Sequence, residues 1–377
     1  MLDWIEQMGG PESAAAAIAP AVRALFARSR RTWTAFAAEN GSNGDAAACD
    51  GETVRIQNQD DLASLEKIYG LLQEIAAAGI SPRQVILDGI GRFTLSEAPA
   101  RGTGRLDGRI CLVTGGAQGF GEGIARELAA AGAVLVIADL NLTLAEQVAR
   151  SINSQYGEQT ALALPADVGQ EESVRKLIEA ITLRFGGLDL LVSNAGVLRA
   201  GGLEDMSLQT FEFVTRINYT AFFLMAKYGS RPMKIQARFD PEYTSDIVQI
   251  NSKSGLEGSN RNFAYAGGKF GGIGLVQSFA KELVENRIKV NAICPGNYYE
   301  GPLWSDPEKG LFVQYLKTGK VPGAKTVQDV YESYIAKVPM RRGCSPADVA
   351  RAIFYCVEQV YETGQAIPVT GGQNMLK

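Results

Sequence analysis

Seven short apolar runs, separated by longer amphipathic stretches, constrain the fold of the chain from Arg109 onward. The runs are apolar at consecutive positions rather than at every second one, which is typical of strands buried on both faces. Strands that alternate with helices form a parallel sheet covered on each side. The sequence therefore predicts an α/β fold with a doubly wound parallel sheet of the Rossmann type. The expected strands are Ile110–Thr114, Val134–Asp139, Ala161–Leu164, Leu188–Ser193, Ile247–Asn251, Lys289–Ile293 and Ala366–Val369, and the helical patterns between them include Gly121–Ala131, Glu171–Phe185 and Phe263–Glu285.

The first hundred residues have a different texture, rich in alanine and helical in pattern. We expect residues 1–100 to form a small, mainly helical, non-catalytic extension, followed by the α/β domain at residues 106–377. Within the extension and its junction, the pattern predicts helices around 12–39 and 59–78, a loop at Asn40–Asp50, a short strand at Gln84–Asp88 and a linker at Ser96–Gly108.

The chain has no histidine, which narrows its chemistry more than any other compositional fact. Nucleophiles activated by histidine and imidazole metal sites are excluded, so any general acid or base must be a carboxylate, lysine, tyrosine or cysteine side chain. We expect no metal site. The cysteines are scattered without a C-x-x-C pair, which favours buried free thiols in a reducing compartment; they are Cys49, Cys111, Cys294, Cys344 and Cys356.

Charge and hydropathy bear on partners and location. The 37 basic and 41 acidic residues leave a net charge of −4 without a basic stripe, so no nucleic-acid partner is expected. The start of the chain contains Asp3 and Glu6 and lacks the basic and apolar segments of a signal peptide. No apolar segment approaches the ~18 residues of a membrane span. We therefore expect a cytoplasmic protein that binds no membrane.

A glycine-rich turn joins the first expected strand to a helix, in the order Thr114-Gly115-Gly116-Ala117-Gln118-Gly119-Phe120-Gly121. Glycines let the backbone turn sharply and approach a pyrophosphate, which rests on the free N–H groups of the helix N-terminus. In many proteins such a segment is only a tight turn, but its place between a strand and a helix favours dinucleotide binding. The candidate cofactor contacts here are Gly115, Gln118, Gly119, Phe120 and Gly121.

Asp139 closes the second expected strand, 139 − 119 = 20 residues after Gly119. A carboxylate at this distance is suited to bind the hydroxyls of the adenosine ribose. Neither Leu140-Asn141-Leu142 nor the glycine-rich turn contains Arg or Lys, so a 2′-phosphate would meet uncompensated repulsion. NAD is therefore expected rather than NADP, with Asp139 and Leu140 beside it. The alternative interpretation is a surface aspartate at a strand end.

Tyr265 and Lys269 are four residues apart in a helical pattern and so share one helix face. Alone, such a pair is more often a surface tyrosine beside a solvated lysine. Ser252 lies thirteen residues before Tyr265, at the end of an expected strand. Because ligands bind at the carboxyl ends of parallel strands, we expect Ser252 on the same edge as the glycine-rich turn.

These residues resemble the short-chain dehydrogenase/reductase family, and the resemblance covers about residues 106–377. It implies a nicotinamide-dependent oxidoreductase that assembles as a homotetramer or homodimer, partly through the helix of Tyr265. The implied catalytic residues are Ser252, Tyr265, Lys269 and Asn218, and the further motifs implied to contact the cofactor are Asp167-Val168, Asn194-Ala195-Gly196 and Pro295-Gly296.

The chemistry of tyrosine fits this resemblance. A free tyrosine has a pKa of about 10, too high for a base near neutrality. The Lys269 ammonium and a positive nicotinamide ring are expected to lower that pKa, so that Tyr265 takes the hydroxyl proton as hydride leaves. Ser252 would hold the substrate oxygen, and Lys269 would also bind the nicotinamide ribose. Relatives that carry a Thr a few residues after Pro295-Gly296 use it on the carboxamide; this chain has none there, so the backbone or Asn297 is left for that contact.

Within the family, the finer resemblance is to dehydrogenases of sugar-alcohol phosphates, of the kind that interconvert sorbitol 6-phosphate and fructose 6-phosphate. It rests on Ile250–Gly255, Lys269–Gly272, Lys337–Pro339, Arg341–Cys344 and Val369–Gln373. A phosphate needs cations near the site, and Lys253 and Arg261 are the candidates, with a structural role equally open for Lys253. The long insertion Gly296–Arg342 is expected to form a lid. Its other lysines are better interpreted as a solvated face; they are Lys309, Lys317, Lys320, Lys325 and Lys337.

The segment Pro82–Leu95 resembles the end of class II aldolase domains, which hold their metal with histidines. Without histidine, the extension is expected to pack on the dehydrogenase or to mediate assembly. Two alternative functions stay open at this point. One is a dehydrogenase of an unphosphorylated sugar or polyol, and the other is a non-catalytic NAD sensor, although such proteins typically lose the tyrosine or lysine that this chain retains.

Overall fold

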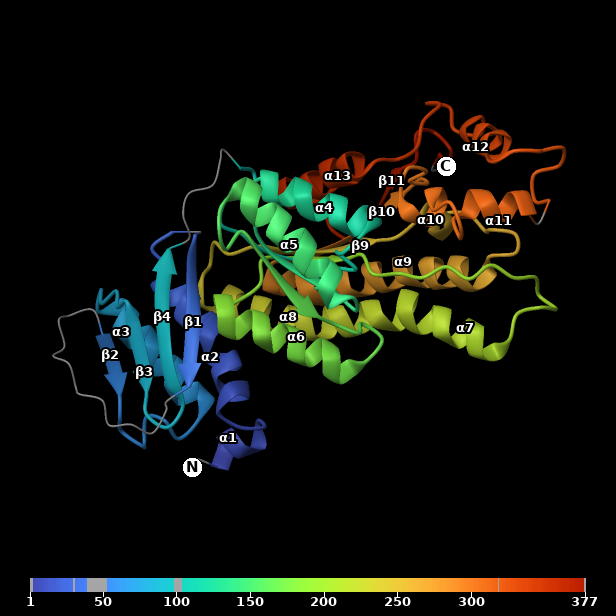
Figure 1. Cartoon of the computed structure of the whole chain (residues 1–377). Helices are drawn as coiled ribbons and strands as arrows, with labels where there is room; N and C mark the ends of the chain where they lie inside the picture. The colour runs from blue at the N-terminus through green and yellow to red at the C-terminus, as the bar shows by residue number, and fades with distance from the viewer. Residues whose placement is uncertain (1–2, 30, 39–52, 98–103, 318, 376–377) are drawn as a thin grey trace.

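The computed structural model describes residues 3–29, 31–38, 53–97, 104–317 and 319–375. Its main body is a parallel seven-stranded sheet in the order β11-β10-β9-β8-β5-β6-β7 (Figure 1). The chain enters this sheet in the middle, at β5, and continues outward through β6 to β7. It then returns to the middle at β8 and continues outward on the other side through β9 and β10 to β11. This is the doubly wound fold expected from the sequence. The strands are β5 (Ile110–Thr114), β6 (Val134–Asp139), β7 (Ala161–Pro165), β8 (Leu190–Ser193), β9 (Ser245–Ile250), β10 (Ile288–Pro295) and β11 (Ala366–Val369).

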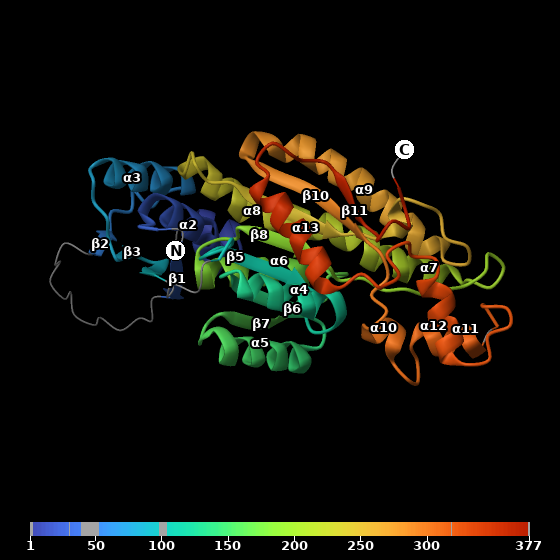
Figure 2. The same cartoon turned by 90° about the horizontal axis from the view of Figure 1, so that it is seen from above.

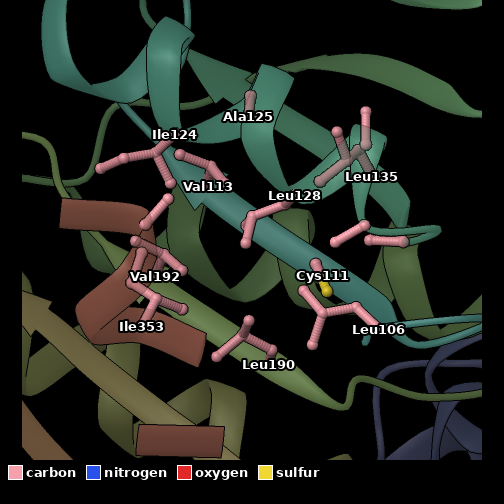
Figure 3. Close-up of a cluster of buried hydrophobic side chains, with 14 of the residues drawn as sticks. Leu106, Cys111, Val113, Ile124, Ala125, Leu128, Leu135, Leu190, Val192 and Ile353 are labelled. Atoms are coloured by element: carbon pink, nitrogen blue, oxygen red, sulfur yellow. The ribbon is translucent and has the colours of Figure 1, made fainter. Parts of the chain in front are cut away.

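Helices cover both faces of this sheet (Figure 2). Consecutive side chains of β5 point to opposite faces, as a strand requires. Cys111 and Val113 pack towards α4 and α13, as Figure 3 shows, whereas Ile110 and Leu112 pack in the core on the other face. The consecutive apolar positions in the sequence are explained by these two cores. The helices are α4 (Gly119–Ala130), α5 (Leu142–Tyr156) and α13 (Pro346–Glu358) on one face, and α6 (Glu171–Phe185), α8 (Ala221–Phe239) and α9 (Phe263–Leu283) on the other, with α7 (Leu208–Thr215) preceding α8.

The extension has three helices packed on a small sheet of order β1-β4-β3-β2. The helix expected over 12–39 is wrong beyond Phe26, because residues 32–38 form a strand that pairs antiparallel with β4. That strand is rich in aromatic and β-branched residues, which favour strands, and Phe36 pairs with Phe93 across the sheet. The loop expected at Asn40–Asp50 lies outside the described residues. The elements are α1 (Asp3–Gln7), α2 (Pro11–Phe26), α3 (Leu65–Ala77), β1 (Thr32–Ala38), β2 (Thr53–Ile56), β3 (Gln84–Leu87) and β4 (Gly91–Glu97).

The extension packs against the α/β domain through α2 and β1, which contact α6 and α8. At the centre of this contact, the Arg23 guanidinium binds both carboxylate oxygens of Asp189 at 2.9 Å, and both side chains are buried. A second, exposed ion pair joins Arg238 to Glu66 at 2.7 Å. The extension therefore docks at the end of the sheet away from the lid (Figure 1).

The insertion after β10 folds as three short helices with an aromatic core of its own. Tyr299 is almost fully buried at its centre, in edge contact with Trp304 and close to Phe312 and Tyr334. The helices are α10 (Pro302–Ser305), α11 (Leu311–Lys317) and α12 (Val327–Ile335). Among the residues the structure describes, no helix combines the length and apolar character needed to cross a bilayer.

Candidate active site

The glycine-rich turn links β5 to α4 with a geometry that side chains would obstruct. Gly115 and Gly119 have φ values of 62° and 60°, in the left-handed region that favours glycine. A Cβ on Gly115 would lie 2.9 Å from the Ala195 Cα, and one on Gly121 would lie 2.0 Å from the Gly115 carbonyl oxygen. A Cβ on Gly119 would meet only Pro302 of the lid, at 4.0 Å. The turn thus leaves open space before the free N–H groups of α4, a shape that fits a dinucleotide pyrophosphate.

Two polar side chains hold the strand ends around this turn. The Asn194 side-chain amide donates to the carbonyls of Thr114 and Gly115, at 2.9 and 3.1 Å. The Thr114 hydroxyl accepts the backbone N–H groups of Asn194 and Ala195. Asn194-Ala195-Gly196 therefore ties the end of β8 to the end of β5, next to the glycine-rich turn.

Asp139 lies at the end of β6, beside the turn, as expected. Its carboxylate accepts the backbone N–H of Ala117 at 3.0 Å and that of Asn141 at 2.9 Å. The neighbouring Leu140 is 78% exposed, so it has no role in the core. The arrangement directs a negative charge towards the position where a ribose would follow the pyrophosphate.

Asp167-Val168 follows β7 on the same edge. The Asp167 carboxylate accepts the backbone N–H of Gly169 at 2.9 Å, and its own N–H donates to the Ser173 hydroxyl. Val168 is buried in the core. This pair therefore orders the loop before α6, and the turn, Asp139 and Asp167 line consecutive strand ends.

Ser252, Tyr265 and Lys269 come together at the carboxyl end of β9. The Ser252 hydroxyl accepts the backbone N–H of Ser254 at 3.1 Å and lies near the Tyr265 phenol. The Lys269 ammonium donates to the Ile250 carbonyl at 2.8 Å and lies 5.6 Å from the centre of the Tyr265 ring. The three side chains, expected to meet from their spacing, share one site, next to Asn218 and Asn251.

Burial dominates the electrostatics of this site. It raises the pKa of Tyr265 above its ordinary value, and the hydrogen bond to Ser252 opposes this shift. Burial also lowers the pKa of Lys269 to about 8. The expected lowering of the tyrosine pKa by Lys269 is therefore not found among these side chains alone. Cys294, which sequence reasoning assigned only to a buried strand, lies close to Ser252 and Lys269, and burial raises its pKa to about 11.

Asn218 lies in a π-helical turn, Arg216–Thr220, between α7 and α8. Its side-chain amide donates to the Val197 carbonyl at 2.7 Å and accepts the Val197 N–H at 3.3 Å. The amide also donates to the Val214 carbonyl at 3.0 Å. π-Helical turns inside longer helices occur frequently at functional sites. The wide turn places Asn218 against the strand-end loop that follows Gly196.

Pro295-Gly296 ends β10, and Gly296 donates to the Val369 carbonyl. The Asn297 side chain donates to the Tyr299 hydroxyl at 3.0 Å and so faces the lid core. The buried Gln373 Oε1 accepts no hydrogen bond from the described residues, and it lies 3.6 Å from the position that a Cβ on Gly296 would take. Gln373 was noticed in the sequence only as part of a terminal motif; the fold brings its amide to the Pro295-Gly296 turn.

The two cations expected to bind substrate, Lys253 and Arg261, differ in burial and in their charged neighbours. Lys253 directly follows Ser252 and is half-buried, with Glu257 and Lys337 as its charged neighbours. Arg261 is exposed and pairs with Asp205 at 3.2 Å. Lys320 and Lys337 of the lid are exposed, as expected for a solvated face, and the charge of Lys337 adds to the lowering of the pKa of both Lys253 and Lys320.

A glycine-rich turn before a helix, an acidic second-strand end and a Ser-Tyr-Lys site define a nicotinamide-dependent alcohol oxidoreductase. Residues 109–304 match the short chain dehydrogenase family, and the chain belongs to this family. The chain is 38% identical to sorbitol-6-phosphate 2-dehydrogenase of Escherichia coli K12 over 273 residues, or 71% of this chain and 99% of that protein. It is also 33% identical to a 3-oxoacyl-(acyl-carrier-protein) reductase of Aquifex aeolicus, over 71% of this chain and 98% of that one.

Solved structures agree on the fold. A crystal structure of sorbitol-6-phosphate 2-dehydrogenase from Erwinia amylovora covers 71% of this chain and 100% of its own, with 37% identity and a TM-score of 0.65. An NADP complex of Pseudomonas aeruginosa RhlG covers 72% of this chain and 98% of its own, with 29% identity and a TM-score of 0.61. Relatives named for different substrates and an NADP-bound neighbour mean that family membership fixes neither the substrate nor the choice between NAD and NADP.

Proposed function

We propose that this protein is an NAD-dependent dehydrogenase that interconverts a sugar-alcohol phosphate and a ketose phosphate, of the sorbitol 6-phosphate and fructose 6-phosphate type. The observation that carries the proposal is the placement of Lys253 directly beside Ser252, at the site that Ser252 shares with Tyr265 and Lys269. A lysine held at the reacting end of the site suits a polyol that bears an anionic group. The likeness to two sorbitol-6-phosphate 2-dehydrogenases supports the same substrate class.

The side chains divide the work of an alcohol oxidation. The Ser252 hydroxyl holds the substrate oxygen. Tyr265 takes the hydroxyl proton as the phenolate in oxidation, and as the phenol it returns the proton in reduction. Lys269 carries a buried ammonium next to the Tyr265 ring and favours the phenolate once the proton has left. Asn218 holds the Val197 carbonyl and so orders the loop beside the triad. The nicotinamide cofactor, when bound, accepts or supplies the hydride.

The choice of NAD rests on Asp139. Its carboxylate is fixed by two backbone N–H groups beside the glycine-rich turn, and Leu140 offers no positive charge. A ribose with free hydroxyls can donate to this carboxylate, whereas a 2′-phosphate is repelled by it. Asp167, Val168, Asn194, Ala195 and Gly196 complete the adenine and ribose side, and Pro295 and Gly296 the nicotinamide side.

The proposal is tested by following NADH oxidation by absorbance, with fructose 6-phosphate and with fructose in parallel assays. We expect turnover with the phosphate ester and little with the free sugar. Equal turnover of both would favour a dehydrogenase of unphosphorylated sugars or polyols. Binding of NADH without turnover of either would favour another substrate or a protein that only senses the cofactor. NADPH in place of NADH tests the cofactor.

We also propose that residues 1–100 form a non-catalytic brace for the dehydrogenase domain at 106–377. Support comes from the buried Arg23–Asp189 pair, which lies just before β8, at the end of the sheet opposite to the strand ends near Ser252 and Tyr265. For assembly we propose a homotetramer or homodimer, supported by exposed aromatic side chains along α7, α8 and α9, namely Phe211, Phe223 and Phe270. The molar mass in solution tests this assembly.

A further inference from the structure

Two lysines of the lid are held side by side on a pair of stacked rings. Tyr315 and Tyr334 stack with centres 5.6 Å apart and an angle of 20° between their planes. The Lys320 ammonium lies 4.0 Å from the centre of the Tyr315 ring, and the Lys337 ammonium lies 4.6 Å from the centre of the Tyr334 ring. Cation–π contacts of this kind hold an ammonium in place without neutralising its charge.

The segment that follows Lys337 runs back to the catalytic edge of the sheet. Met340 donates its backbone N–H to the Gly371 carbonyl at 3.2 Å, and a Cβ on Gly371 would lie 2.9 Å from a Val338 methyl carbon. Just beyond this turn, the Asn374 amide donates to the Glu257 carboxylate at 2.6 Å. Glu257 is the acidic neighbour of Lys253, the residue after Ser252. The C-terminal turn therefore contacts both the segment after Lys337 and the acidic neighbour of Lys253.

Four cations gather where the lid meets the catalytic edge. Burial lowers the pKa of Lys253, Glu257 opposes this shift, and the charge of Lys337 adds to it. Burial likewise lowers the pKa of Lys320, with further lowering by Lys337 and Arg261. The charge of Lys337 therefore acts on both Lys253 and Lys320, and that of Arg261 acts on Lys320. Asp205, which pairs with Arg261, and Glu257 are the acidic partners within the cluster.

Clustered like charges repel one another until an anion binds between them, and a phosphate dianion accepts hydrogen bonds from several donors at once. We propose that Lys253, Lys320, Lys337 and Arg261 form the subsite that binds the substrate phosphate and joins the lid to the catalytic edge. This inference rests on the proposed function, since it assigns the phosphate end of a polyol whose reacting carbon lies at Ser252 and Tyr265. Lys320 and Lys337 thereby determine specificity for phosphorylated over free sugars.

The test uses the full chain with Lys320→Gln, Lys337→Gln and the double variant, together with Lys309→Gln as the matched control. Lys309 is an exposed lid lysine whose charge faces Asp306 instead of the cluster. We expect each cluster substitution to raise KM for fructose 6-phosphate roughly 10-fold, the lower end of what a charged hydrogen bond contributes, with kcat and the Kd of NADH nearly unchanged. Lys309→Gln should match the wild type.

Inorganic phosphate provides a readout that does not depend on turnover. We expect it to raise the Tm of the wild type and of Lys309→Gln, and to do so much less for the double variant. If fructose 6-phosphate is turned over but the cluster variants behave like Lys309→Gln in both assays, the subsite is overturned while the proposed function stands. If no sugar phosphate is turned over but phosphate binding still depends on Lys320 and Lys337, the subsite stands and the proposed substrate fails.

Discussion

Arg23 and Asp189 form a buried, bidentate ion pair between the N-terminal extension and the start of β8. The same carboxylate accepts the backbone N–H of Ile110 at 2.8 Å, at the start of the strand that leads to the glycine-rich turn. The Tyr243 hydroxyl and the Gln236 side-chain amide donate to it as well, at 3.1 and 3.2 Å. One carboxylate thus joins the extension to the central strands of the dehydrogenase sheet.

Substitution of Arg23→Met should destabilise the protein by about 3–5 kcal/mol, because it leaves the Asp189 carboxylate buried without its counter-ion. The Arg23 guanidinium holds the pKa of Asp189 below its ordinary value, so the pair contributes stability above about pH 4 and loses it as the pH falls through the lowered pKa. In the variant, burial without Arg23 favours the protonated acid. The stability gap between wild type and variant, measured by urea unfolding, should therefore narrow from pH 7 towards pH 4.

The control for this prediction is Arg238→Met, which breaks the exposed pair with Glu66 between the same two parts of the chain. An exposed ion pair contributes little, so we expect a loss of at most about 1 kcal/mol. Equal losses in the two variants would show that the buried pair does not anchor the extension.

Substitution of Tyr265→Phe should lower kcat about 100-fold or more, because it removes the proton donor and acceptor while keeping the ring. The ring packing against Lys269 is retained, so NADH binding, followed by fluorescence, should change little. Full turnover in this variant would refute the assignment of Tyr265. Ser252→Ala serves as the companion variant and should also lose turnover, since the hydroxyl positions both the phenol and the substrate oxygen.

Substitution of Lys269→Met gives a prediction on stability as well as activity. Burial lowers the pKa of Lys269 to about 8, below the ordinary value of 10.5. Between pH 8 and pH 10.5 the unfolded chain therefore binds more protons than the folded chain. Burial of the ammonium lowers the stability of the fold in full below pH 8, and this destabilisation disappears as the pH rises to 10.5. We expect turnover to be lost, and the Tm of the variant relative to wild type to fall between pH 7.5 and pH 10. A constant difference in Tm would show that the ammonium is not buried.

Substitution of Asp139→Asn should shift cofactor preference towards NADP by roughly 10-fold in the ratio of kcat/KM values, because it removes the charge that repels a 2′-phosphate. The two N–H groups bind different carboxylate oxygens of Asp139, so the single Asn oxygen keeps one of these hydrogen bonds and the turn loses the other. Adding Leu140→Arg, at an exposed position, should increase the shift. An unchanged ratio would mean that Asp139 does not face the ribose.

The central strands of the dehydrogenase domain were predictable because they are buried along nearly their whole length. The outer strands β7 and β11 are only partly buried and were predicted from their short apolar runs beside helical patterns. The strands at Ile110–Thr114, Val134–Asp139 and Ala366–Val369 have the expected bounds. The secondary structure of the extension was harder to predict from the sequence, because its strands are short and half-exposed and its small residues suit a helix as well as a strand. Residues 32–38 form a strand through pairing with β4, a partner distant in sequence.

The residues of the candidate site also fall into two groups, those that could be predicted from the sequence and those that could not. Ser252, Tyr265 and Lys269 could be found from their spacing, since a helix period and a strand end fix their relative positions. Gln373, Asn374, Lys320 and Lys337 could not, because they reach the site from segments whose position depends on the lid and the C-terminal turn.

The sequence by itself determined the sheet, the cofactor turn and the reacting groups, since each depends on local periodicity or on the shared edge of parallel strands. Only the tertiary structure decided which charges meet. The Arg23–Asp189 pair spans 166 residues of chain, and the electrostatic effect of Lys337 on Lys253 depends on the position of the lid, which has its aromatic core around Tyr299. Charged side chains carry no periodic signal for their partners, because a lysine on a solvated face and a lysine in a binding site look alike until packing brings other charges near them.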